Sequence, residues 1–200
     1  LFVQGMRTWL FEKLWIKNLI VRSLGIDQER VLFSEHHLSH AASAYFCSPF
    51  EEAAVVTFDG VGEWATTTIG EGKGNSLTIE REMHFPHSIG LLYSAFTAFL
   101  GFEVNEGEYK VMGMAPYGSP RYVDAIWRII RRDGADDGPF WLDPSYFAFQ
   151  RSPTHSYTRK FVELFGEPRD PSVPFFTDST GVPGYYDSPP HNFVELCRYN

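Results

Sequence analysis

The sequence contains few cysteines and no cluster of them. Its 200 residues include only two, Cys47 and Cys197, which are far apart and lack the spacing of a metal-binding pair. A disulfide framework is therefore excluded, and two free thiols fit a reducing compartment. We expect a cytoplasmic protein whose fold depends on a hydrophobic core, which a chain of this length with 44% hydrophobic residues can form.

A long apolar run and a concentration of positive charge are also missing. The apolar stretch at the start of the sequence, residues 1–21, is interrupted by Arg7, Glu12, Lys13 and Lys17. These charges argue against a signal peptide and against a membrane span. The formal net charge is −8, and the basic residues are scattered apart from short clusters. We therefore expect neither a membrane nor a nucleic acid as a partner.

The most informative stretch is SEHHLSHAASAYF, residues 34–46, which holds three of the seven histidines. Ser34 suits a helix N-cap and the alanines favour a helix, so His36 and His40 fall at i and i+4 on one face. This is metal-ligand spacing, and two imidazoles suit zinc, iron(II) or manganese. His37 lies three residues from His40, so spacing alone leaves open which pair points inward. The alternative is a helix with surface histidines or hydrogen-bonded core histidines.

A predicted strand at 53–59, AAVVTFD, ends in an aspartate and a glycine turn. With the histidine helix upstream, Asp59 makes a candidate site of two histidines and one carboxylate. Gly60 and Gly62 allow a tight turn and close approach of the backbone to a phosphate, although an ordinary hairpin turn is the alternative. Glu63 could act as a base or support a ligand, but a solvated turn residue is the simpler role.

The rest of the pattern predicts helices around a three-stranded antiparallel meander. The first expected elements are an amphipathic helix over 8–23 packed on the core and a short buried strand at 31–33. The strands of the meander are expected at 53–59, 64–70 and 77–84, followed by a buried helix that is capped by Ser88 and packs on the sheet. A helix over 123–132 and a short strand within 140–150 complete the prediction. A membrane-surface role for the first helix is the less favoured alternative. Lys110 lies among glycines and could contact a nucleotide or a carboxylate, or extend along a helix surface.

Four segments in this order and spacing resemble the NodU/CmcH-type O-carbamoyltransferases. They are SEHHLSHAASAYF, VVTFDGVGEWATT, FPHSIGLLYSAFTAFLGF and EGEYKVMGMAPYG, and the resemblance covers about residues 8–170. The fold that it implies is α/β, an incomplete actin-like or Hsp70-like ATPase lobe of RNase-H-like halves, with the meander packed on helices. Residues 1–170 would be part of the amino-terminal domain, and 171–200 an irregular, poorly ordered tail.

The resemblance also implies a reaction and its cofactors. A carbamoyl group passes from carbamoyl phosphate, with ATP, through carbamoyl-adenylate to a hydroxyl of a sugar or natural-product acceptor. A divalent metal, iron in related proteins, would be held by His36, His40 and Asp59. Gly60 and Gly62 match positions near the nucleotide phosphates.

Three further roles are our own inference from the motifs. Lys110 is assigned to the nucleotide, and either His37 or Glu63 to the base that deprotonates the acceptor. A homodimer is one conceivable assembly.

The sequence departs from the family pattern in what it lacks. It has no opening strand with an Asp-Gly phosphate turn, no later aspartate and no carboxyl-terminal activation domain, and it begins with Leu1. We therefore expect a fragment that is inactive alone. The alternatives are a nucleotide-binding interaction module without turnover and a metal hydrolase built on two histidines and one carboxylate.

Overall fold

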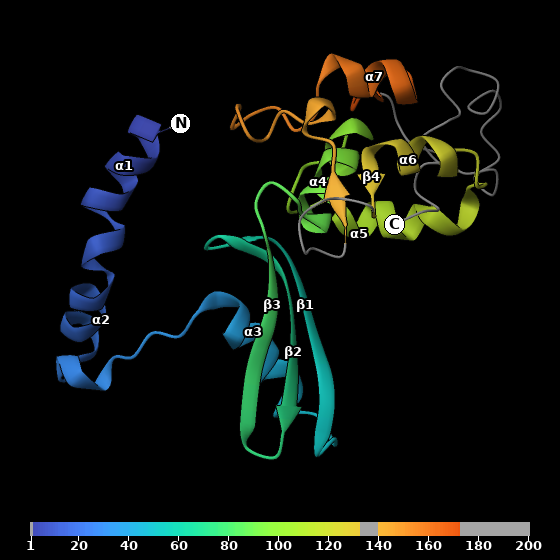
Figure 1. Cartoon of the computed structure of the whole chain (residues 1–200). Helices are drawn as coiled ribbons and strands as arrows, with labels where there is room; N and C mark the ends of the chain where they lie inside the picture. Colours follow the sequence, from blue (N-terminus) through green and yellow to red (C-terminus); the bar gives the residue numbers. More distant parts are fainter. Residues whose placement is uncertain (1, 133–139, 173–200) are drawn as a thin grey trace.

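The computed structural model describes residues 2–132 and 140–172, which form a helical segment, a sheet with one helix on it, and a cluster of helices (Figure 1). The α-helices are α1 (Phe2–Phe11), α2 (Ile16–Leu24), α3 (His36–Tyr45), α4 (Ile89–Phe99), α5 (Glu108–Met114), α6 (Val123–Ile129) and α7 (Arg159–Phe165). The strands are β1 (Glu52–Gly62), β2 (Ala65–Lys73), β3 (Ser76–His84), β4 (Ile130–Arg131) and β5 (Trp141–Leu142). Short 3-10 helices are η1 (Lys13–Trp15), η2 (Gln28–Arg30), η3 (Ala115–Tyr117) and η4 (Pro144–Tyr146).

The predicted antiparallel meander is confirmed. Strands β1, β2 and β3 pair in sequence order, with Thr57 opposite Thr68 in the first pair and Glu71 opposite Thr78 in the second. The turn between β2 and β3 is tight, and Gly74 at its tip has a left-handed φ of 55°, which glycine adopts without steric cost. The alternating β-branched and polar residues of these strands explain why the sheet could be anticipated.

Helix α3 lies across one face of the sheet (Figure 1). Ala41, Tyr45 and Val55 form a small buried cluster between the helix and β1. The Tyr45 hydroxyl donates to the Glu51 carbonyl at 2.8 Å, and its ring lies so close to Gly72 that a Cβ there would meet the ring at 2.5 Å. The carboxyl end of α3 is therefore fixed on the sheet by one aromatic side chain.

Helix α4 begins as the sequence predicts, with Ser88 as a side-chain cap that accepts from the Leu91 amide at 3.0 Å. Its packing differs from the prediction in one respect. The first turn of α4 meets the end of β1, but most of its buried side chains face other helices rather than the sheet. The main core consists of Leu92, Ala95, Phe96, Phe99, Leu100, Val111, Met114, Ile129, Leu142, Phe147, Phe161 and Phe165.

The later elements largely follow the sequence pattern. The helix predicted over 123–132 ends at Ile129, where the chain turns into β4. The short strand predicted within 140–150 is present as β5, which pairs antiparallel with β4 through Ile130 and Leu142. Because Leu142 is buried in the main core and Ile130 packs against it, this two-stranded ribbon closes one side of that core.

The prediction that an amphipathic helix over 8–23 packs on the core is wrong. The segment is two helices, α1 and α2, separated by η1, and it extends away from the sheet and the helical cluster (Figure 1). Five apolar side chains of the predicted helix are exposed: Leu10 47%, Phe11 74%, Leu14 48%, Trp15 57% and Leu19 64%. Helical periodicity identifies an apolar face, but it does not show what that face contacts.

Two expectations just before α3 also need correction. Residues 31–33 form no strand, because no neighbouring strand among the described residues supplies the hydrogen bonds that a strand requires. Val31 is buried while Leu32 is 87% exposed. The N-cap of α3 is Glu35 rather than Ser34, and no side-chain cap bond forms. The helix consequently starts at His36.

No helix among the described residues has the length and apolar character needed to cross a membrane. Cys47 is a free, exposed thiol, whereas Cys197 lies outside the described residues. The tail predicted from residue 171 also falls outside them from residue 173 onward.

Truncation of one aromatic side chain tests the main core. Phe161 is fully buried, and its ring centroid lies 5.1, 5.3 and 4.6 Å from those of Phe96, Phe99 and Phe165. Phe161→Ala should lower the free energy of unfolding by about 3–5 kcal/mol, because it removes a large side chain and leaves a cavity. Urea unfolding measures this effect. The matched control is Phe50→Ala at a 64% exposed position, and an equal loss there would contradict this assignment of the core.

Candidate metal centre

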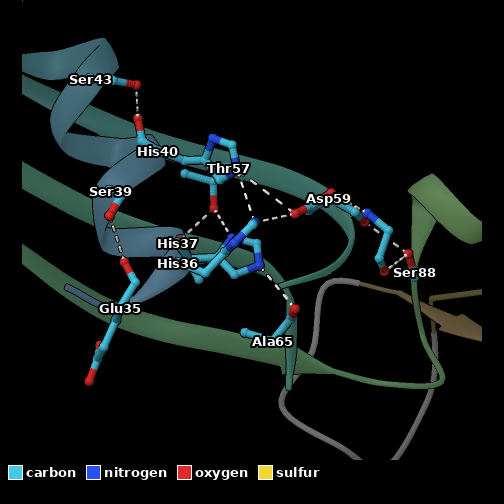
Figure 2. Close-up of polar contacts among 12 residues, drawn as sticks. Glu35, His36, His37, Ser39, His40, Ser43, Thr57, Asp59, Ala65 and Ser88 are labelled. Carbon is cyan, nitrogen blue, oxygen red and sulfur yellow. Dashed lines mark hydrogen bonds and ion pairs between the residues drawn. The ribbon is translucent and has the colours of Figure 1, made fainter. Parts of the chain in front are cut away.

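His36 and His40 project from the first turns of α3 toward the end of β1 (Figure 2). Their ring centroids are 4.6 Å apart, and their Nε2 atoms are separated by 3.0 Å. Residues four apart share a helix face, so the predicted placement of this pair follows from helix geometry. Both imidazoles present the same nitrogen to the space between them.

Asp59 completes the group from β1. Its Oδ2 forms a hydrogen bond with His36 Nε2 and lies 3.8 Å from His40 Nε2. One ligand atom from each of the three side chains lies within 4.8 Å of the others. The exposed side-chain fractions are 40% for His36, 53% for His40 and 33% for Asp59, so the three groups can be reached from outside.

The Asp59 carboxylate is stabilised in its ionised form. Partial burial acts to raise its pKa, but the Gly60 amide hydrogen bond, the His36 hydrogen bond and the charges of His36 and His40 together leave the pKa below its ordinary value. The amide of Gly60 donates to Asp59 Oδ1 at 2.6 Å. The carboxylate is therefore ready to act as a ligand at neutral pH.

The three donors fit a divalent transition metal. Metal bonds of about 2.0–2.2 Å place neighbouring ligands of a tetrahedral site roughly 3.3–3.6 Å apart, close to the 3.0 and 3.8 Å from His40 Nε2 to its two partners. His36 Nε2 and Asp59 Oδ2 are hydrogen-bonded to each other, so these two atoms would have to move apart when a metal binds. Two imidazoles and one carboxylate suit zinc, iron(II) or manganese, and three protein ligands leave positions open for substrate. Whether a metal binds here stays a prediction.

Ser88 holds the backbone that carries Asp59. Its hydroxyl is fully buried and lies 2.9 Å from the Asp59 carbonyl and 2.6 Å from the Gly60 carbonyl, to which it donates (Figure 2). Gly90 allows this approach, because a Cβ there would lie 2.6 Å from the Asp59 carbonyl oxygen. The sequence indicated Ser88 as a helix cap, and the role of Gly90 was missed. The one available signal was a small residue in the first turn after the cap.

Gly62 has a steric role beside the histidines. A Cβ at this position would lie 2.1 Å from His36 Cδ2, so only glycine lets the β1 backbone lie against the imidazole. The Gly60 amide is already bonded to Asp59, and a phosphate contact by this amide would require release of that bond. The phosphate roles predicted for both glycines stay untested.

His37 is a buried histidine whose two ring nitrogens are both engaged. Nε2 lies 3.0 Å from the Ala65 carbonyl oxygen, which can only accept, so Nε2 donates. Nδ1 then accepts from the Thr57 hydroxyl at 2.6 Å, and Thr57 Oγ1 lies 2.7 Å from Thr68 Oγ1. These hydrogen bonds anchor α3 to β1 and β2. Because they engage both ring nitrogens, His37 has no free nitrogen with which to act as the predicted base.

The other two candidates lie at the surface. Glu63 is exposed at the turn after β1, with a left-handed φ of 61°. The Lys110 ammonium lies 5.8 Å from the ring centroids of both Phe102 and Tyr109, on the exposed side of α5. No contact within the described residues joins Lys110 to the two histidines or to Asp59, so its predicted nucleotide role has no support from this geometry.

The fold and the site together describe a mixed α/β domain with a potential metal centre where a sheet meets a helical cluster. The profile of a family described as the carbamoyltransferase N-terminus matches residues 1–172, and the chain belongs to this family. The resemblance noted in the sequence is thereby confirmed.

The relatives of this chain include two nodulation proteins and one uncharacterized protein. The uncharacterized protein sll1178 of Synechocystis is 52% identical over 175 residues, which are 84% of this chain and 28% of that protein. The nodulation protein NolNO of Sinorhizobium fredii is 39% identical over 110 residues, 54% of this chain and 16% of that protein. The nodulation protein NolO of Bradyrhizobium diazoefficiens is 40% identical over 87 residues, 42% of this chain and 15% of that protein. The chain thus spans less than a third of each.

A methyl group at Gly62 should displace a candidate metal ligand. In Gly62→Ala the new Cβ meets the His36 ring, so we expect His36 to move and metal affinity to fall by about tenfold or more. Zinc titration and the histidine NMR signals measure these two effects. Gly113→Ala is the control, since an exposed glycine of α5 has no neighbour within 4 Å. Unchanged zinc affinity in Gly62→Ala would show that the contact with His36 has no bearing on the site.

Proposed function

We propose that His36, His40 and Asp59 hold a divalent metal at the centre where a carbamoyl group is transferred. The observation that carries this proposal is the convergence of three ligand-type side chains from α3 and β1 in a member of the carbamoyltransferase N-terminal family. Because the three groups are partly exposed, a substrate can approach them. Iron(II) is the metal we favour, with zinc and manganese as alternatives.

We also propose that the sheet with α3 and α4 is part of an actin-like ATPase lobe with RNase-H-like halves. The three-stranded antiparallel meander, followed by a helix whose first turn contacts the end of β1, supports this assignment. In such a lobe the nucleotide lies in a cleft between two halves, and this chain would supply one wall. The rest of the longer protein would then supply the other wall.

The proposed reaction moves the carbamoyl group of carbamoyl-adenylate, made from carbamoyl phosphate and ATP, to an acceptor hydroxyl. A bond forms between the hydroxyl oxygen and the carbamoyl carbon. The bond from that carbon to the adenylate oxygen breaks, its electron pair leaves with AMP, and the hydroxyl proton passes to a base. A bound metal would supply Lewis-acid stabilisation of the charge that develops in the transition state.

This chain contributes ligands and their support to the reaction. His36 and His40 present their Nε2 atoms, and Asp59 supplies the negative charge that a divalent ion requires. Ser88 and Gly62 hold the positions of Asp59 and His36 through the contacts described above. Glu63 remains the candidate base from this chain, because its exposed carboxylate follows Gly62 directly.

Loss of one ligand tests the metal centre in the full-length protein. His40→Ala should lower metal affinity by more than about 100-fold, because loss of a residue that only supports a ligand already costs about 10- to 100-fold. The variant should also form no AMP from ATP and carbamoyl phosphate. Metal content after dialysis and chromatography of AMP measure the two effects. The fold should survive, because alanine favours helix at this exposed position.

The matched control is His155→Ala, at an exposed histidine whose bonds are to Ser152 and Thr154. It should retain both metal and AMP formation. Wild-type metal content in His40→Ala would overturn the proposed ligand set. AMP formed in the absence of any hydroxyl acceptor, at the full rate, would instead favour a hydrolase.

A further inference from the structure

The three-stranded sheet has two outer edges, and the strands at these edges differ in character. Pairing runs in the order β1-β2-β3, so β1 and β3 each have one side on which no strand of the described residues pairs (Figure 1). In an antiparallel pair, successive residues alternate between bonding to the neighbouring strand and pointing away from it. About half of the backbone N–H and C=O groups of an edge strand therefore need water or a further strand as a partner.

Strand β3 has the features of an edge that stays in water. Glu80, Arg81 and Glu82 are successive charged residues, and all of them are exposed. A bulge also interrupts the pairing with β2 and leaves Glu80 without an opposite residue. Charges and bulges are two means by which proteins prevent an edge strand from pairing further. The β3 edge is thus suited to remain the border of the sheet.

The middle of strand β1 has none of this protection. Residues 53–58, AAVVTF, include no charged residue and no proline, and their pairing with β2 is continuous. The nearest charged residues, Glu52 and Asp59, lie at the two ends of this segment. An uninterrupted apolar run is typical of a strand that is covered on both faces. The composition of β1 therefore fits an interior strand rather than an edge.

The two faces of β1 are covered unequally. Val55 is buried against α3, whereas Val56 and Phe58, which strand alternation places on the opposite face, are 49% and 59% exposed. These apolar side chains lie beside the unpaired backbone groups of the β1 edge. A helix packed on this face would cover the side chains but leave the backbone groups without partners. A further strand beside β1 supplies both the apolar cover and the hydrogen bonds.

We propose that a strand from the remainder of the full-length polypeptide pairs with the free edge of β1 and extends the sheet. This chain spans less than a third of each relative described above, so a full-length protein of that size has further sequence to supply the strand. Apolar side chains of the added segment pack on Val56 and Phe58. The inference depends neither on a bound metal nor on the reaction, and a second copy of the chain at the same edge is the competing arrangement.

Amide hydrogen exchange of the full-length protein, read by mass spectrometry, compares the two edges in one sample. If a strand pairs with β1, nearly all amides of residues 53–58 should exchange slowly, whereas about half of those in residues 77–82 should exchange fast. Fast exchange of half of the amides in 53–58 would overturn the proposal. Slow exchange there that is lost on dilution, together with dissociation of a dimer in sedimentation, would assign the edge to a second copy and overturn it as well.

A lysine placed in each edge strand gives an independent test. Val56→Lys should lower the midpoint of thermal unfolding of the full-length protein by about 5 °C or more, because the added strand would bury the charge without a partner. The matched control is Thr78→Lys, at an exposed position of β3, which should shift the midpoint by about 2 °C or less. Equal shifts in the two variants would contradict the proposal. The exchange experiment needs no substitution, so it decides the question even where Val56→Lys does not fold.

Discussion

The buried hydroxyl of Ser88 is the contact on which the arrangement of the site depends. It joins the last residues of β1 to the first turn of α4, and so it connects the small core under α3 to the large aromatic core of the helical cluster. Asp59 lies at this junction. A hydroxyl that bonds two carbonyl oxygens and one amide within a fully buried position leaves the Asp59 backbone little freedom. A change in the packing of either core would therefore shift Asp59 and alter the binding of any metal or substrate held there.

The placement of His36, His40 and Asp59 could be predicted from the sequence because it depends on local geometry. His36 and His40 share a helix face whatever the helix packs against, and Asp59 follows from the end of a clearly patterned strand. The steric roles of Gly62 and Gly90 could not be predicted in this way. Each depends on a contact with a residue 26 or 31 positions earlier, where a helix meets a strand, and no local pattern specifies that distance. Sequence reasoning instead assigned Gly62 to a phosphate.

The amino-terminal helices show where periodicity stops being informative. The apolar face of α1 and α2 is real, but within the described part of the chain it remains open to solvent. The stretch at 31–33 has the composition of a strand and no neighbouring strand to pair with. Both predictions assumed a partner for an apolar surface. A burial pattern in the sequence reflects the whole protein, and this chain spans less than a third of each relative it was compared with.

The hydrogen bonds of His37 decide the rotation of α3 about its own axis. Successive residues of an α-helix are about 100° apart, so a turn of one residue would carry His36 away from Asp59. Such a turn would also break the bonds from His37 to Thr57 and to the Ala65 carbonyl, inside a buried environment where lost partners are costly. The histidine that does not face the centre thus sets the angular phase of the two that do. His37 therefore fixes the position of the helix, whereas His36 and His40 on the same helix remain available to bind a ligand.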